Sequence, residues 1–179
     1  MGRRSRRASG VRVPLTLLLL LAAALAFGLV RTGVVDVGGG AAPPADATLD
    51  ADLSAAQHAR VLDVVDGDTI DVEIQGRQER VRYYGSNTPE RGDPCYREAV
   101  ERNRELAGTE VLLLPDRRDR DRYGRLLRYV FTTDGHSLDA ALVSEGLARA
   151  WTEDGAYRDV LVRMEEGAQA ASRGCLWSP

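Results

Sequence analysis

The chain has 179 residues, enough for one domain of ordinary size with further segments attached. Its 44% apolar and 28% charged residues support a buried core and exclude an intrinsically disordered protein. All 24 basic residues are Arg, and without the five in the first twelve residues 19 Arg stand against 27 acidic residues. The resulting formal charge of −8 excludes nucleic-acid binding by overall charge and requires a local basic patch instead.

Residues 1–30 predict an export signal. An Arg-rich start is followed by an uncharged apolar run, 13–30, which as a helix would reach about 27 Å, just short of a ~30 Å hydrocarbon core. Ala24 and Ala26 form a small-x-small cleavage site, and the positive-inside rule places the rest of the chain outside the cytoplasm. We expect an extracytoplasmic protein, either secreted after cleavage of a signal peptide or anchored to the membrane by an uncleaved apolar helix.

Residues 31–57 predict a flexible linker. Three Gly at 38–40 are followed by an Ala and Pro run and by scattered Asp without periodicity. The folded unit is expected at 58–179.

Five β-favouring runs follow in the folded unit, with a helical pattern between the third and the fourth. The strands are expected at 60–65, 69–75, 79–85, 110–114 and 126–132, with a charged loop at 115–125. The helices are expected at 96–107, at 137–143 with Ser137 as N-cap, and at 157–171 with Gly174 as its C′ residue. This order predicts an α+β fold, a five-stranded OB-type β-barrel with about three α-helices.

Cys95 and Cys175 are the only two cysteines. In an exported protein such a pair more often forms a disulfide than a reactive thiol pair, and two free thiols are the alternative.

Three polar clusters place charge where strand patterns alone do not require it. They are the turn 66–69 (D-G-D-T), Arg82 with the segment 87–90 (N-T-P-E), and the loop 119–125 (D-R-D-R-Y-G-R). Each alone has an ordinary explanation: a solvated hairpin, an Arg on an exposed strand face, and a mixed-charge surface loop.

Taken together, the clusters supply what phosphodiester hydrolysis requires. Asp68, the side-chain oxygen of Asn87 and the carbonyl of Thr88 offer oxygen ligands to a hard divalent cation. Glu90 can align or deprotonate an attacking water, and two Arg can neutralise charge that builds up on the phosphoryl oxygens.

Four motifs give the chain a specific resemblance. V-V-D-G-D-T-I (64–70), V-R-Y-Y-G-S-N-T-P-E (81–90), D-R-Y-G-R-L-L (121–127) and A-L-V-S-E-G-L-A (141–148) occur in the order and spacing of the thermonuclease, or staphylococcal-nuclease-like, family. The resemblance covers roughly residues 59–178. It implies the OB barrel with three helices and Ca²⁺-dependent, sequence-nonspecific endonucleolytic hydrolysis of DNA and RNA that leaves 3′-phosphate ends.

The resemblance also implies roles for individual residues. The catalytic residues would be Arg82, Glu90 and Arg125. Asp68 and Thr88 would bind Ca²⁺. Asp66 would be an acid near the metal that does not bind it directly. Arg122 and Tyr123 would contact a terminal phosphate of the bound nucleotide.

Two positions depart from the family pattern. Asn87 stands where the best-known members carry a second Ca²⁺-binding Asp, so the site loses a full negative charge and we expect weaker Ca²⁺ affinity. Trp151 stands where aromatic substrate contacts are expected, and it either stacks on a base or belongs to the core.

The Arg-rich stretch 117–128 is expected to be the phosphate-facing patch on an otherwise acidic body. Nothing in the sequence requires more than a monomer. The alternative to an exported nuclease is a catalytically inactive module of the same family that only binds nucleic acid or a protein. An active site held at the membrane by the uncut N-terminal helix, for degrading DNA during uptake, is a third possibility.

Overall fold

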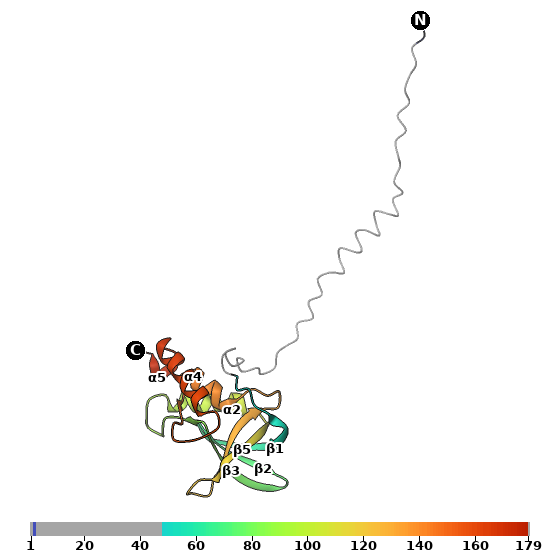
Figure 1. Ribbon diagram of the computed structural model, residues 1–179, viewed down its shortest axis with the longest axis vertical. Helices are drawn as coiled ribbons and strands as arrows, with labels where there is room; N and C mark the ends of the chain where they lie inside the picture. The colour runs from blue at the N-terminus through green and yellow to red at the C-terminus, as the bar shows by residue number, and fades with distance from the viewer. Residues whose placement is uncertain (1, 3–47, 179) are drawn as a thin grey trace. The chain divides into compact units, whose positions relative to one another are not determined.

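The computed structural model describes Gly2 and residues 48–178 (Figure 1). Except for Gly2, the predicted export segment 1–30 lies outside the described residues, as does the linker up to residue 47. Among the described residues, no helix combines the length and the apolar character that crossing a bilayer requires.

Five strands close into a barrel in the order β1-β2-β3-β6-β5, with β5 pairing back to β1. Neighbouring strands are antiparallel except for β3 and β6, which run parallel. The strands are β1 (Gln57–Asp66), β2 (Thr69–Ile74), β3 (Arg77–Tyr83), β5 (Glu110–Arg120) and β6 (Leu126–Thr132). The predicted OB-type barrel in an α+β fold is therefore confirmed.

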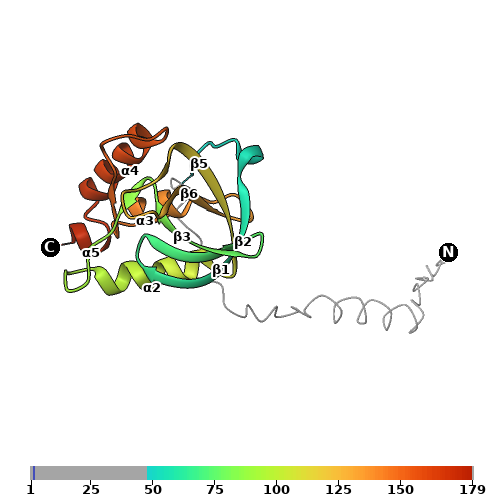
Figure 2. The same ribbon diagram turned by 90° about the horizontal axis from the view of Figure 1, so that it is seen from below.

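Within residues 48–178, four α-helices and a two-stranded sheet accompany the barrel. Helix α2 packs along β1, whereas α3 packs against both β6 and α4 (Figure 2). The helices are α2 (Tyr96–Ala107), α3 (Leu138–Ser144), α4 (Arg158–Ala170) and the short α5 (Gly174–Trp177). The small sheet pairs β4 (Ser86–Asn87) with β7 (Arg149–Ala150).

The core follows from period-two alternation in the strands. Ile70, Val72 and Ile74 of β2 are buried, as are Val81 and Tyr83 of β3, while the residues between them are more exposed. Because successive side chains of a strand point to opposite faces, this pattern turns one face of the sheet into the barrel interior.

Strands β1 and β5 are longer than the expected 60–65 and 110–114. Strand β5 continues from 114 to Arg120 through the charged stretch that we predicted to be a loop. Its charged side chains stay at the surface, where Arg120 binds Glu79 at 2.9 Å and Asp119 binds Arg128 at 2.7 Å. Pairing with β6 therefore extends a strand whose own β propensity is low.

The structure also differs around Gly174. Helix α4 ends at Ala170, and Gly174 begins α5 rather than serving as the C′ residue of α4. Its φ of +67° and the carbonyl oxygen of Glu145 facing its α-carbon leave no room for a side chain.

Part of the segment predicted to be a linker is structured. Leu49 is buried in the core, and a 3₁₀ turn, η1 (Leu53–Ala55), precedes β1. Asp52 caps this turn by accepting a hydrogen bond from the backbone N–H of Ser54 at 2.9 Å.

Cys95 and Cys175 form the predicted disulfide, with their Cα atoms 5.6 Å apart. The bond joins the residue before α2 to α5 across 80 positions of sequence.

We expect the Cys95→Ser/Cys175→Ser variant to lose about 2–4 kcal/mol of unfolding free energy, because the open loop gains conformational freedom in the unfolded state. Urea unfolding of both proteins measures the difference, and a loss below about 1 kcal/mol would contradict it.

Candidate active site

A cavity of about 600 Å³ lies at one end of the barrel, where β1 ends, β2 begins and β3 ends. We call it the rim cavity. It brings together eight of the nine residues that the sequence predicted for the metal and substrate site. They are Asp66, Asp68, Arg82, Asn87, Glu90, Arg122, Tyr123 and Arg125. The ninth, Thr88, is buried beside the cavity and bonded to Asp68.

The turn between β1 and β2 fixes the position of Asp68. The Asp66 carboxylate accepts a hydrogen bond from the backbone N–H of Asp68 at 3.0 Å. A β-carbon on Gly67 would lie 2.7 Å from the Thr88 hydroxyl oxygen and 2.8 Å from the Ala99 β-carbon, so only glycine lets the turn sit this close to both. The D-G-D sequence is therefore required by packing as well as by turn geometry.

The Asp68 carboxylate is almost completely buried, with 5% of the residue exposed. One oxygen accepts hydrogen bonds from the Thr88 backbone N–H at 2.7 Å and hydroxyl at 2.9 Å, while the other lies 3.1 Å from Nε of Arg82. Burial raises the pKa of Asp68 to about 6, and the Asp66 charge adds to this, although Arg82 and Thr88 favour the ionised form. A cation bound beside the buried Asp68 carboxylate would therefore be stabilised by it.

Arg82 lies on β3 with its side chain only 12% exposed. Nη1 donates to the carbonyls of Tyr83 and Ser86, both at 2.7 Å, and Nη2 donates to the side-chain oxygen of Asn87 at 2.8 Å. The planar guanidinium is thus held at several points between Asp68 and Asn87, a fixed geometry that a flexible Lys would not reproduce.

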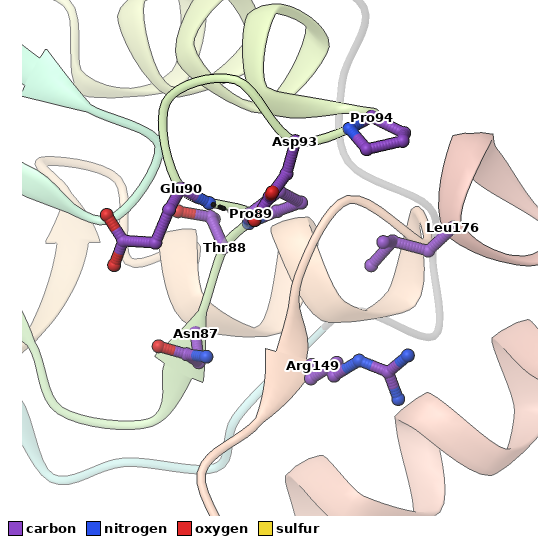
Figure 3. Close-up of a pocket in the computed structure, with 8 residues that line it drawn as sticks. All are labelled: Asn87, Thr88, Pro89, Glu90, Asp93, Pro94, Arg149 and Leu176. Atoms are coloured by element: carbon purple, nitrogen blue, oxygen red, sulfur yellow. Dashed lines mark hydrogen bonds between the residues drawn. The ribbon is translucent and has the colours of Figure 1, made fainter.

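Glu90 is exposed, unlike Asp68 and Arg82. Its backbone N–H donates to Asp93 at 3.3 Å, whereas its carboxylate is turned away from Asp93 (Figure 3). Within residues 48–178 the Glu90 carboxylate has no hydrogen-bond or ion-pair partner. Pro89 and the Asp93 contact fix the backbone while the side chain remains available to water.

The loop between β5 and β6 brings the second Arg to the cavity. Asp121 accepts hydrogen bonds from the backbone N–H of Tyr123 at 2.9 Å and of Arg125 at 3.0 Å, and it binds Nε of Arg125 at 2.6 Å. Arg122 donates to the Tyr123 hydroxyl at 2.6 Å, and Tyr123 is 69% exposed. Arg125 is therefore held in place, whereas Arg122 and Tyr123 lie at the open edge.

The expected Arg patch is divided by the fold. Arg118, Arg122 and Arg125 line the rim cavity. Arg120 and Arg128 instead border a different hollow and bind Glu79 and Asp119, so the stretch 117–128 is not one continuous phosphate-facing surface. The Arg side chains come from three places: Arg118 and Arg120 lie on β5, Arg122 and Arg125 in the loop after it, and Arg128 on β6.

Trp151 lies in the cavity wall. It is half-buried, lines the rim cavity with Tyr84, and donates its indole N–H to Asp154 at 3.0 Å. Asp154 also binds Arg118 through two contacts of 2.7 Å, and this pairing lowers the pKa of Asp154. Trp151 does not belong to the hydrophobic core, so the interpretation of it as a core residue is wrong, and stacking on a base stays a prediction.

The residues present fit a hard divalent cation by their chemistry. Asp68, Asn87 and Thr88 offer only oxygen donors, and the buried Asp68 lies close to a second carboxylate, Asp66. No group of three or more His, Cys, Asp or Glu side chains able to hold a metal occurs among the described residues. A cation here would depend on amide and backbone oxygens and on water in addition to Asp68.

Two buried polar residues that position this site were not among the predicted site residues. Asn103 of α2 donates to the Asp66 carbonyl at 2.9 Å and accepts from the Tyr83 hydroxyl at 2.6 Å. Asp139 of α3 accepts from the Gly85 N–H at 2.8 Å and the Ser86 hydroxyl at 3.0 Å, and from the Val130 N–H at 3.2 Å. The sequence feature that could have identified Asp139 is that it is an Asp inside the otherwise apolar run 138–143.

Burial raises the pKa of Asp139 to about 6 from an ordinary 3.8. The folded state therefore binds this proton more tightly than the unfolded chain does, and the contribution of Asp139 to stability falls as the pH rises from about 4 to about 6. We expect the unfolding free energy of Asp139→Asn, minus that of the wild type, to increase by about 2 kcal/mol between about pH 4 and pH 7. Urea unfolding across this range measures it, and a pH-independent difference would contradict the expectation.

The model of the family described as staphylococcal nuclease homologue matches residues 80–179. The chain belongs to this family. It is 34% identical over 131 residues to the thermonuclease of Staphylococcus hyicus, covering 68% of this chain and 76% of that protein.

Two proteins of Bacillus subtilis are also similar to this member of the staphylococcal nuclease family. The endonuclease YncB is 38% identical and the SPbeta prophage-derived endonuclease YokF is 39% identical, each over 125 residues and 64% of this chain. The chain spans only about half the length of these two relatives, 58% and 42%.

Proposed function

We propose that the protein is a Ca²⁺-dependent, sequence-nonspecific nuclease that hydrolyses phosphodiester bonds of DNA and RNA and leaves 3′-phosphate ends. One observation carries the proposal: Asp68, Arg82, Glu90 and Arg125 come from four separate segments and line the same cavity. The printed names of the relatives, endonuclease and thermonuclease, agree with it.

The proposed roles are supported by where each side chain lies. Asp68 and Asn87 with the Thr88 carbonyl would hold Ca²⁺, which when bound supplies Lewis-acid stabilisation of the phosphoryl group. Arg82 and Arg125 lie in the same cavity and would neutralise the equatorial oxygens. Glu90, exposed and without a partner for its carboxylate in the described structure, would take a proton from the attacking water.

The proposed reaction is a displacement at phosphorus by water. The water oxygen forms a new bond to phosphorus, its proton passes to Glu90, and the bond between phosphorus and the 5′-oxygen breaks. The leaving 5′-oxygen takes a proton from solvent, so the products are a 3′-phosphate and a 5′-hydroxyl.

The alternative is a module that only binds nucleic acid or a protein. Binding a backbone does not require an exposed carboxylate beside two Arg, because a carboxylate repels phosphate. The presence of Glu90 in the same cavity as Arg82 and Arg125 therefore favours catalysis over binding alone.

The disulfide favours an oxidising compartment and so supports the proposal that the protein acts outside the cytoplasm, secreted or anchored.

Cleavage of single-stranded DNA by the chain, with added Ca²⁺ and then with a chelator, tests the proposal. We expect cleavage that depends on Ca²⁺ and products that end in 3′-phosphate. Binding without cleavage in the presence of any divalent cation would replace the proposal by the binding module.

We expect the Asn87→Asp variant to bind Ca²⁺ more tightly, by roughly tenfold, because it restores a full negative charge to the ligand set. The gain is limited because the side-chain oxygen of Asn87 also accepts a hydrogen bond from Arg82, which a carboxylate would strengthen. Calorimetric titration with Ca²⁺ measures the affinity, and unchanged affinity would contradict the prediction.

A further inference from the structure

A second cavity of about 380 Å³ adjoins the first. We call it the side cavity (Figure 3). The two cavities share only Asn87 and Glu90 among their lining residues, so these two side chains form the wall between them. The side cavity contains none of the residues assigned above to the phosphate at the open edge, Arg122 and Tyr123.

Arg149 supplies the cation of the side cavity. Its strand, β7, pairs antiparallel with β4 so that Arg149 lies directly opposite Asn87. Residues directly opposite each other in an antiparallel pair point to the same face, so Arg149 and Asn87 share one face of the small sheet, and both line the side cavity. The ladder thus couples the position of Arg149 to that of a residue of the proposed metal site.

The Arg149 guanidinium remains accessible. Its side chain is 59% exposed, its contact with Glu165 is long at 3.8 Å, and it lies over the Trp177 ring at 4.7 Å from the centroid. The aromatic ring supports the cation without occupying its hydrogen-bond donors. Arg149 can therefore bind an incoming anion.

The remaining wall of the side cavity is apolar and covalently held. Pro89, Pro94 and Leu176 line it. Pro94 immediately precedes Cys95 and Leu176 immediately follows Cys175, so the disulfide joins the two sides of the cavity. A surface fixed in this way loses little entropy when a flat, partly apolar group packs on it.

We propose that the side cavity binds the next nucleotide of the nucleic-acid chain, beyond the scissile phosphate on the side away from Arg122 and Tyr123. The phosphate of this nucleotide binds Arg149, and its sugar or base packs on Pro89, Pro94 and Leu176. This orientation keeps the phosphate away from Glu90 and Asp93, the two carboxylates that line the same cavity. The inference rests on the proposed nuclease function and adds a substrate contact to it.

The test compares Arg149→Gln with Arg163→Gln, which removes the same charge from an exposed position of α4. Two substrates are used: a single-stranded DNA oligonucleotide long enough to cross both cavities, and a dinucleotide whose only phosphate is the scissile one. We expect Arg149→Gln to raise KM for the oligonucleotide roughly tenfold, with kcat unchanged and with little effect on the dinucleotide. Arg163→Gln should behave as the wild type with both.

The outcomes separate the two proposals. If the wild type cleaves the oligonucleotide and the two Arg variants behave alike, the nucleotide site is wrong and the nuclease function stands. If the wild type cleaves neither substrate, the nuclease function is wrong. Fluorescence anisotropy with the oligonucleotide in the presence of a chelator then tests whether the side cavity binds a nucleotide. In that measurement a loss of affinity confined to Arg149→Gln supports the site, and equal affinities of the two variants overturn it.

Discussion

The Arg82→Gln variant is expected to cleave DNA roughly 100- to 1,000-fold more slowly than the wild type in kcat. Arg82 is held by hydrogen bonds to Tyr83, Ser86 and Asn87, so it meets the charge that develops on the phosphoryl group without first being reorganised. Gln is neutral and has fewer donors, so it would provide neither the positive charge nor the planar set of N–H donors that Arg82 presents.

A second consequence of the substitution acts through Asp68. Arg82 is the cation that offsets burial at this carboxylate, so its removal raises the pKa of Asp68 further. The proposed Ca²⁺ site then competes with a proton at higher pH, and the pH at which the variant reaches half of its maximal activity should move upward.

Arg80→Gln is the matched control. Arg80 lies on the same strand two residues earlier, and it binds the Asp71 carboxylate at 2.7 and 2.8 Å on the outside of the barrel. Its removal should leave kcat within about twofold of the wild type, because an exposed ion pair of this kind contributes about 0–1 kcal/mol. Equal losses of activity in the two variants would contradict a specific role for Arg82.

The barrel was predictable because its strands contain runs that alternate or are mostly apolar. Strand β2 alternates between inward apolar and outward polar residues, and β6 is almost entirely buried. The two-residue ladder of β4 and β7 carries no periodicity, and the far half of β5 is charged, so neither has a local signal. Both depend on pairing with a partner distant in sequence.

The same distinction applies to the site. Residues whose side chains perform chemistry, such as Asp68 and Glu90, belong to short motifs and were predictable from residue type and resemblance. Asp139 and Arg149 have functions that depend on tertiary contacts: one satisfies donors on two segments distant in sequence, and the other lies opposite Asn87 only because β7 pairs with β4. A sequence pattern identifies a reactive group more readily than the group that positions it.

The Glu90→Gln variant should lose roughly 100- to 10,000-fold in kcat, because it can still bind water by a hydrogen bond but cannot accept its proton. Structural damage is expected to be small, since Glu90 is exposed and its fixed contact, a backbone N–H to Asp93, does not involve the carboxylate. Thermal unfolding should therefore be unchanged, and oligonucleotide binding equal or tighter after loss of a negative charge near phosphate.

Glu101→Gln on the exposed face of α2 removes the same charge away from the cavity and should leave kcat unchanged. Steady-state cleavage at saturating Ca²⁺ compares the three proteins. Because Asp68, Asn87 and Thr88 are intact in Glu90→Gln, a normal Ca²⁺ affinity together with a large loss of kcat assigns Glu90 to proton transfer. A loss of Ca²⁺ affinity that accounts for the whole loss of activity would make Glu90 a metal ligand instead.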